Sequence, residues 1–158
     1  MYLSAKMCAT GLAAAACLIF LPSAAFAGEC PAGKTGQDVT PPGPSEPKNV
    51  TDMVISSIDL GAGYNIPGRQ LRMRRLEIKP GGVVPWHGHE ARPANIYIMS
   101  GSVTEYRSNC AVPIEHKKGD VVAESGAVSH WWRNNSRRTT VLLSADILPP
   151  DMSADASM

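Results

Sequence analysis

Between residues 51 and 148 the chain is a succession of short β-like runs, each ended by a turn after a few residues. The runs are rich in β-branched and other apolar residues, and glycine, proline, asparagine and aspartate form the turns, as at Pro80-Gly81-Gly82 and Gly119-Asp120. No stretch of this region shows the period of about 3.6 residues that an amphipathic helix needs. Eight or so short strands with such turns predict an all-β fold, either a sandwich or a barrel.

The first 27 residues are different in character and are typical of an export signal. Lys6 supplies the positive start, residues 10–21 form an apolar run, and Ala25-Phe26-Ala27 offers small residues before a cut at Gly28. The apolar run is shorter than a membrane-spanning helix requires. We therefore expect a signal peptide, residues 1–27, cleaved after Ala27, and a periplasmic or secreted protein without a stable membrane anchor. An uncleaved N-terminal anchor is the alternative.

Removal of the signal leaves a chain long enough for one domain and balanced in charge. Lys6 is the only charged residue removed, so 14 basic and 14 acidic residues remain. No basic stripe or acidic tail predicts a nucleic-acid partner, and a small-molecule ligand or substrate is the partner that we expect. We expect a Pro/Gly-rich extended lead-in at 28–50, a barrel at 51–148 and a disordered tail at 149–158. A homodimer is left open.

Two of the four cysteines, Cys8 and Cys17, leave with the signal, so Cys30 and Cys110 remain. In an oxidising compartment two remaining cysteines are expected to bond to each other. That disulfide would fasten the lead-in to the barrel. Two unpaired thiols are the alternative.

Three histidines are candidate metal ligands. His87 and His89 are two residues apart on a predicted strand, so both side chains project from the same face. Two imidazoles on one face can chelate a divalent ion, and neutral imidazole suits iron, zinc, nickel and copper. His130 begins a later strand and would be the third ligand. Paired histidines on strands also occur without any metal.

The surroundings of these histidines resemble the two motifs of the cupin superfamily. The matching residues are Gly81, His87-Gly88-His89 and Gly101 for the first motif, and Gly119-Asp120, His130 and Asn134 for the second. This resemblance implies a single cupin-type β-barrel, also called a double-stranded β-helix. It also implies one divalent transition metal ion on the three histidines, without distinguishing iron, manganese, zinc, nickel and copper.

The chain departs from the first cupin motif at one ligand. Ala94 occupies the position of the glutamate that is normally the fourth ligand. The resemblance therefore implies a three-histidine face with no carboxylate from the usual position, similar to the sites of certain iron dioxygenases. Such a face leaves coordination positions open to water or substrate.

Two further residues are candidates for catalysis. Glu124 lies six residues before His130, and we interpret it first as a water-facing carboxylate at the rim. If it faces the barrel instead, it is a distant fourth ligand or a general base. Arg92 lies in the loop after the histidine pair, where a guanidinium can hold a carboxylate or an enolate. His116 precedes Lys117 and Lys118 in a turn, and we expect it at the surface.

The remaining arginines are expected on the outer face. Pairing with glutamates such as Glu77 and Glu105 would account for Arg72, Arg74, Arg75 and Arg107. A β-bulge at Arg74-Arg75 would then let the neighbouring apolar side chains all point inward, namely Leu71, Met73, Leu76 and Ile78.

Three functions are compatible with these residues. The first is a metalloenzyme, a dioxygenase-like protein or a lyase or isomerase, that acts on a small oxygenated acid or diketone. The second is a non-catalytic cupin that binds a metal or small ligand as a sensor or storage module. The third is a structural or sugar-binding barrel whose histidines hold no metal.

Overall fold

The computed structural model describes residues 28–61 and 63–152 of the chain. Every regular element in these ranges is a strand: β1 (Lys48–Asp59), β2 (Gln70–Ser100), β3 (Ser102–Arg107), β4 (Ile114–Lys117), β5 (Val121–Arg133) and β6 (Thr140–Leu148). All pairings between them are antiparallel. The predicted all-β class is therefore confirmed. The expected signal peptide and residues 153–158 of the expected tail lie outside the described residues.

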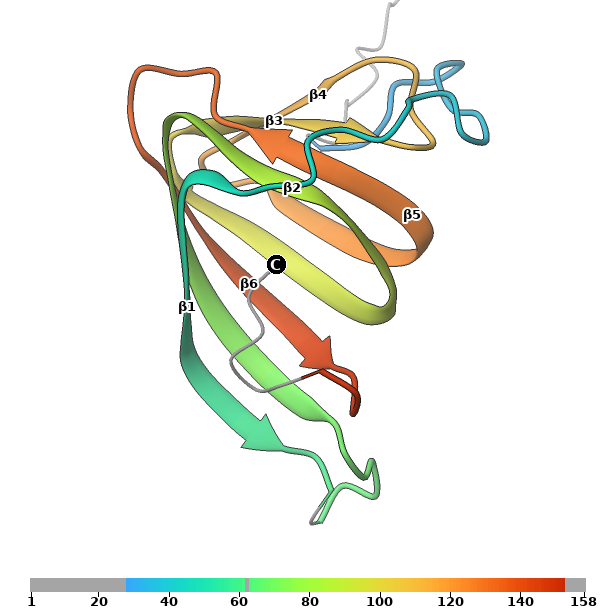
Figure 1. Cartoon of the computed structure of the whole chain (residues 1–158), viewed down its shortest axis with the longest axis vertical. Helices are drawn as coiled ribbons and strands as arrows, with labels where there is room; N and C mark the ends of the chain where they lie inside the picture. Colours follow the sequence, from blue (N-terminus) through green and yellow to red (C-terminus); the bar gives the residue numbers. More distant parts are fainter. Residues whose placement is uncertain (1–27, 62, 153–158) are drawn as a thin grey trace, which may run out of the picture.

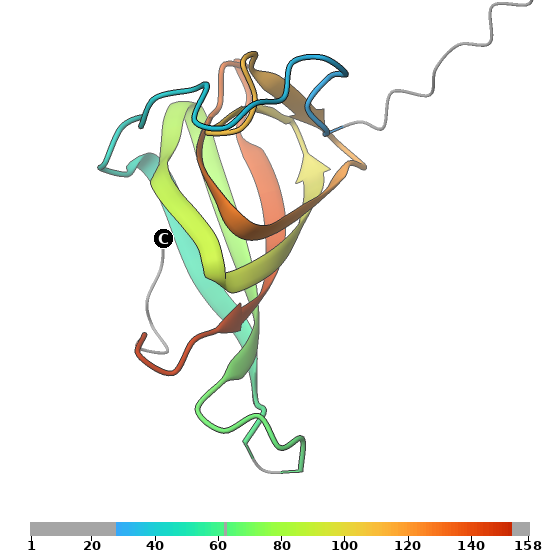
Figure 2. The ribbon, with the colours of Figure 1, turned by 90° about the vertical axis from the view of Figure 1, so that its right-hand side faces the viewer.

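The barrel is organised around β2, which is folded back on itself. Its first part, residues 70–78, pairs with β1 on one side and with β6 on the other. Its last part, residues 94–100, pairs with β6 and with β5, and β3 joins β5 to β4. Figures 1 and 2 show the resulting barrel, with the connection from β1 to β2 at its lower end. No helix in the described part of the chain is long and apolar enough to cross a membrane.

One corner of β2 is set by glycine and by the asparagine of the second motif. Gly81 has a φ of 71°, in the left-handed region that favours glycine. The Gly81 N–H donates to the carbonyl of Asn134, and the Asn134 N–H donates to the carbonyl of Gly82. The Asn134 side chain also donates to the carbonyl of Ile78 at 2.7 Å. This corner therefore fixes the end of β5 against β2.

The barrel interior changes in character along its length. Its apolar part contains Leu76, Ile78, Val84, Ala94, Ile96, Ile98, Val103, Val122, Trp132 and Leu142. On β6 the inward side chains continue from Leu142 to Ser144 and Asp146, which are each 1% exposed. The same strand therefore lines an apolar half and a charged half of the interior.

The expected bulge at Arg74-Arg75 is wrong. Residues 70–78 of β2 pair with β6 without a register shift. Strict alternation therefore holds, and Arg72 and Arg74 face the interior while Leu71 faces outward and is 40% exposed. The arginines are stable inside because acidic side chains of β1 and β6 meet them there.

The lead-in is fastened across one end of the barrel. Cys30 and Cys110 form the expected disulfide, with their Cα atoms 5.7 Å apart. Backbone hydrogen bonds support it: Gly36 N–H donates to the Asn109 carbonyl, and Ala111 N–H donates to the Lys34 carbonyl. The disulfide is compatible with an oxidising extracellular compartment.

Candidate metal centre

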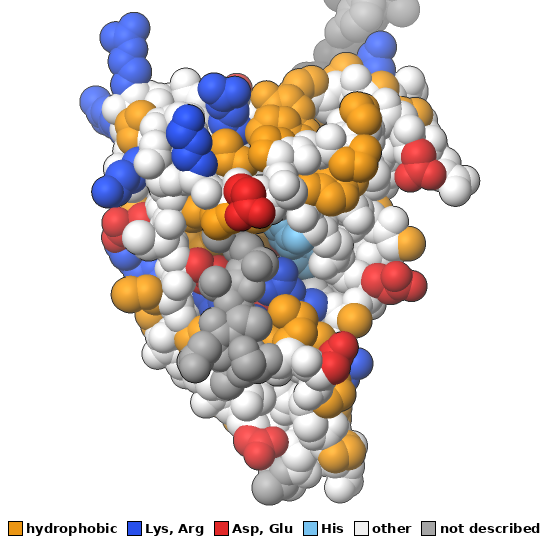
Figure 3. Space-filling model, viewed as in Figure 1, with side chains coloured by type: hydrophobic (Ala, Val, Ile, Leu, Met, Phe, Trp, Pro, Cys, Tyr) orange, Lys and Arg blue, Asp and Glu red, His pale blue; other side chains and the backbone are white. Residues whose placement is uncertain are grey.

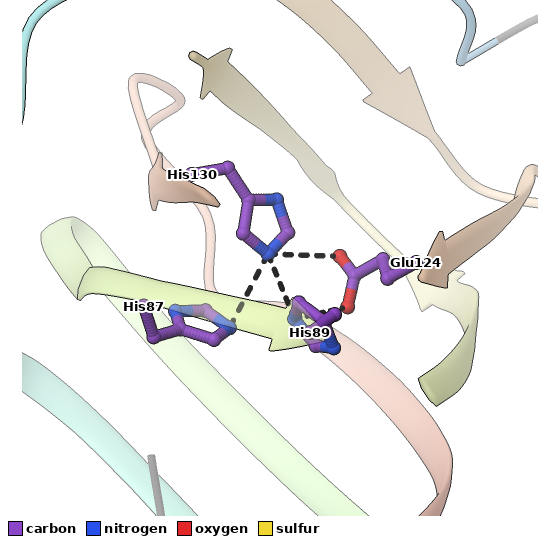
Figure 4. Close-up of side chains that lie close together, drawn as sticks. All are labelled: His87, His89, Glu124 and His130. Atoms are coloured by element: carbon purple, nitrogen blue, oxygen red, sulfur yellow. Dashed lines mark hydrogen bonds and ion pairs between the residues drawn. The ribbon is translucent and has the colours of Figure 1, made fainter. Parts of the chain in front are cut away.

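The three candidate histidines lie together on facing strands. His87 and His89 are on β2, with Gly88 between them, and His130 is the cross-strand partner of His87 on β5. Figure 4 shows the three imidazole rings directed toward one point. The His130 Nε2 atom lies 3.0 Å from His89 Nε2 and 3.3 Å from His87 Nε2.

The other ring nitrogens determine which tautomers are present. Each Nδ1 atom faces an oxygen acceptor: the Pro85 carbonyl for His87 at 2.8 Å, the Arg92 carbonyl for His89 at 2.9 Å, and Glu105 for His130 at 2.5 Å. A carbonyl cannot donate, so His87 and His89 carry a proton on Nδ1, and each neutral ring has its lone pair on Nε2. His130 Nδ1 lies near Trp132 Nε1 as well, at 2.9 Å. The lone pairs of His87 and His89 therefore face His130 Nε2, and three Nε2 atoms this close together form an arrangement that suits a bound cation.

Glu124 completes the cluster, so its expected position at the water-facing rim is wrong. Its side chain is 4% exposed, with Oε2 3.1 Å from His89 Nε2 and Oε1 3.4 Å from His130 Nε2. The even spacing on β5 explains this, because Glu124 and His130 share a strand face and that face lines the interior. The even sequence separation of Glu124 and His130 was the feature of the sequence that could have predicted this position.

The separations of these atoms fit a metal ion. One ligand atom from each of His87, His89, Glu124 and His130 lies within 4.8 Å of all the others. Two nitrogens at about 2.1 Å from one ion, at an angle of about 90–105°, lie about 3.0–3.3 Å apart, as these nitrogens do. Three imidazoles and one carboxylate form a donor set that suits divalent transition metals. The residues present could therefore hold one such ion.

The electrostatics of the metal-free cluster favour ligands that are ready to bind. Burial and the neighbouring His130 lower the pKa of His87 to about 2 and the pKa of His89 to about 4. Burial raises the pKa of Glu124 to about 7. Burial also acts to lower the pKa of His130, but the carboxylates of Glu124 and Glu105 raise it above its ordinary value. His87 and His89 are consequently neutral at neutral pH, which is the form that binds metals.

A buried carboxylate behind His130 was missed in the sequence, because Glu105 was expected on the outer face. Glu105 is fully buried, and its Oε2 atom accepts a hydrogen bond from His116 Nε2 at 2.8 Å. The expected surface position of His116 is therefore also wrong. His116 shares the inner face of β4 with Ile114, and its ring stacks on that of Trp132, with the two ring centroids 4.9 Å apart. The hydrogen bonds from His116 and His130 lower the pKa of Glu105 to about 2, although burial opposes them.

A small cavity adjoins the cluster. It has a volume of about 30 Å³ and is lined by His87, Glu124, Arg74, Ser144 and five apolar side chains, Leu76, Val84, Ile96, Trp132 and Leu142. That volume holds about two water molecules. A ligand bound here would contact the metal ligands and an arginine at the same time.

A family model describing the cupin domain matches residues 74–146, which contain all four residues of the cluster. The matched region is a cupin domain. No curated protein matches the sequence. The fold of this cupin is also found among solved structures.

Three of these structures illustrate the likeness. A crystal structure titled as a predicted oxalate decarboxylase from Thermotoga maritima is 21% identical, with a TM-score of 0.51, over 72% of this cupin and 97% of that chain. A Klebsiella pneumoniae protein with a double-stranded β-helix domain is 16% identical, with a TM-score of 0.51, over 73% and 87%. The cupin domain of Schizosaccharomyces pombe Cnp3 is 12% identical, with a TM-score of 0.51, over 63% and 64%, so this cupin spans less than two thirds of that domain. At these identities the likeness concerns the fold.

In this cupin the carboxylate of the cluster comes from a different strand than the first motif would supply. Ala94 is buried on β2, and its cross-strand partner on β5 is Glu124. The position opposite the missing glutamate therefore carries a glutamate of its own. The small Ala94 side chain leaves the interior free for it.

The arginines of this cupin also differ from expectation. Arg92 lies within β2 rather than in a loop, is 5% exposed, and has its Nη1 atom 3.6 Å from Asp146 Oδ2. Arg107 does not face outward either, because its Nε atom lies 3.3 Å from the buried Glu105. Arg75 does pair with Glu77 on the outer face, as expected.

Proposed function

We propose that this cupin is an exported metalloenzyme that holds one divalent transition metal ion on His87, His89, His130 and Glu124. The observation that carries the proposal is the convergence of three histidine Nε2 atoms and a buried carboxylate on one point. Burying these groups together without a cation is unfavourable, because a proton on His130 or Glu124 provides fewer donors than the cluster has acceptors. A metal ion satisfies all of them at once.

In this proposal the protein side chains position the metal ligands and the substrate, and they exclude water from the site. A bound ion would act as a Lewis acid toward the oxygen atoms of a small ligand. The carbonyls of Pro85 and Arg92 orient the rings of His87 and His89, and Glu105 orients His130. The apolar lining of the cavity keeps bulk water away from the bound ligand. We infer a substrate that is a small oxygenated acid or diketone and a dioxygenase-like, lyase or isomerase reaction.

Export rests on two independent features. The first 27 residues are typical of a signal peptide, with a cut after Ala27. Cys30, just after that cut, is bonded to Cys110. A disulfide that fastens the start of the mature chain needs an oxidising compartment to persist, which supports a periplasmic or secreted location.

The metal content of purified variants tests this proposal. We expect the wild-type protein to bind about one divalent transition metal ion per chain by elemental analysis. His87→Ala and His130→Ala should lose stoichiometric metal while they keep their strand content, because each removes one converging Nε2. Glu124→Gln should weaken metal affinity by roughly tenfold or more, because the amide lacks the negative charge.

Glu90→Gln is the matched control for Glu124→Gln. Glu90 follows His89 directly but is exposed, so its variant should bind metal as the wild type does. Full metal content in His87→Ala or His130→Ala would place the ion elsewhere and reject the proposed site. Full metal content without turnover of any small oxygenated acid or diketone would reject the enzymatic part and retain the metal site.

A further inference from the structure

Three arginine side chains lie inside the barrel, close to the candidate metal centre. Arg72, Arg74 and Arg92 are 1%, 3% and 5% exposed. All three come from β2, two from its first part and one from just before its last part. Guanidinium groups stay charged even when they are buried, so this layer of the interior carries three positive charges.

Two carboxylates face these three guanidinium groups. Asp146 accepts two hydrogen bonds from Arg72, at 3.0 and 2.9 Å, and lies 3.1 Å from Arg74 Nε. Asp52 pairs with Arg74. Arg92 has the longest ion pair of the three arginines, because its nearest carboxylate oxygen, on Asp146, is 3.6 Å away. Its buried Nη1 atom has no hydrogen-bond partner among the described residues.

The layer therefore holds one more positive charge than negative charge among the residues that the structure describes. An uncompensated buried charge is strongly unfavourable unless a counter-ion reaches it. Glu105 and Arg107 balance each other on the other side of His130. A divalent ion on the cluster would bring two positive charges, and Glu124 would neutralise one of them, so one further positive charge would remain. The interior would then carry a net charge of about +2, which an anion can neutralise.

The cavity connects the arginine layer to the cluster. Arg74 and Ser144 line it together with His87 and Glu124. Arg74 Nη2 contacts Ser144 Oγ at 3.3 Å, a long hydrogen bond that leaves one of its N–H groups for a ligand. Figure 3 shows histidine atoms in a hollow of the surface with Lys or Arg atoms next to them. Of the four histidines only His87 is not fully buried, so a ligand entering here meets His87 first.

We propose that the ligand of this cavity is a small carboxylate, held by Arg74 on one side and by the metal centre on the other, while the nearby buried charge of Arg92 adds to the attraction. The proposal rests on the proposed metal site and specifies its substrate class. A carboxylate brings the negative charge that the interior lacks, and its oxygens can accept hydrogen bonds from the guanidinium group of Arg74. A neutral diketone brings no charge, so the arginine layer selects against it.

Glycolate and its uncharged counterpart glycolamide are the probes for this proposal. Titration calorimetry is done on metal-loaded and on metal-free protein at constant chloride concentration. We expect wild-type protein to bind glycolate at least tenfold more tightly than glycolamide. Arg74→Met and Arg92→Met should each weaken glycolate binding at least tenfold, leave glycolamide binding unchanged and leave the metal content unchanged. Arg92→Met leaves Asp146 paired with Arg72 and Arg74, so it tests the proposal if Arg74→Met fails to fold.

Arg75→Met is the matched control, because Arg75 is the neighbour of Arg74 but pairs with Glu77 on the outer face. Its affinity for glycolate should equal that of the wild type. Equal affinity for glycolate and glycolamide, or unchanged glycolate binding in Arg92→Met, would overturn the carboxylate proposal even if the metal site is correct. If no metal binds, the metal-free titrations decide: glycolate binding that requires Arg92 supports the anion site, and its absence rejects it.

Discussion

Glu105 orients His130, the third histidine of the candidate metal centre. One carboxylate oxygen accepts from His130 Nδ1 and the other accepts from His116 Nε2, so both rings depend on the same side chain. Because His116 is itself fully buried, the network has no room to adjust. A metal-binding histidine commonly donates its second N–H to such a carboxylate. Glu105 is therefore a positioning residue of this cupin.

Glu105→Gln should weaken metal affinity by about 10–100-fold. The amide has one acceptor oxygen where the carboxylate has two, so one of the two histidines loses its partner. The carboxylate also raises the pKa of His130. Its loss should lower that pKa, and the midpoint of metal binding against pH should move to lower pH, because a proton competes less well for His130 Nε2. Both quantities are measured by metal titration at several pH values.

Glu115→Gln is the control for this variant, since Glu115 is exposed on β4 next to His116. Its affinity and its midpoint should match those of the wild type. A Glu105→Gln protein that binds metal more weakly with an unchanged midpoint would have lost stability alone, and the positioning role would be rejected.

The lead-in depends on the disulfide for its place on the barrel, because it contains no strand before β1. Its described start covers the buried network: a Cβ atom added to Gly28 would lie 2.9 Å from His116 Nδ1. Thr40 Oγ1 also donates to the Cys110 carbonyl at 2.6 Å. The covalent link between Cys30 and Cys110 therefore acts together with these contacts and with the backbone hydrogen bonds of the segment to hold it on the barrel.

Replacing both Cys30 and Cys110 by serine should lower the free energy of unfolding by about 4 kcal/mol, because the bond closes a long loop and restricts the unfolded chain. The two cysteines are 80 residues apart in the sequence. Urea unfolding of oxidised, reduced and double-serine protein measures the effect. The reduced wild type and the double variant should agree with each other. A change of less than about 1 kcal/mol would mean that the disulfide does not constrain the unfolded state.

The stability of the whole barrel should depend on pH through Glu124 when metal is absent. Burial raises the pKa of Glu124 from 4.5 to about 7. The folded protein then holds a proton that the unfolded chain releases, so the contribution of Glu124 to stability is present below pH 4.5 and is lost as pH rises toward 7. Other titrating groups also destabilise the protein at acid pH, but they do so equally in the wild type and in a Glu124 variant.

Metal-free Glu124→Gln should therefore gain stability relative to the metal-free wild type between pH 4.5 and pH 8, by about 3 kcal/mol as an order of magnitude. Thermal melts or urea unfolding across that range measure the difference between the two proteins. Glu90→Gln, which removes an exposed carboxylate, should show no such gain. A constant difference between Glu124→Gln and the wild type across the range would contradict the buried position of Glu124.

Much of this cupin could be predicted because it depends on local patterns. Turn residues separate short β-like runs, which determine an all-β fold. The spacing of His87 and His89 determines that they share a strand face, and Cys30 and Cys110 are the two cysteines outside the expected signal peptide, so each was expected to pair with the other. Each of these conclusions needs only the period of a strand or a count of residues.

Which charged residues lie inside the barrel was decided by the tertiary structure. Glu105, His116 and the arginines of β2 were expected outside, because a lone charge is unfavourable in a barrel interior. Alternation says only that residues share a face, and it does not say which face is inside. Closure of the barrel brings Asp146 on β6 to Arg72 on β2, and Glu105 on β3 to His130 on β5. Partners so far apart in the sequence make burial of these charges favourable, and the register between strands determines which partners meet.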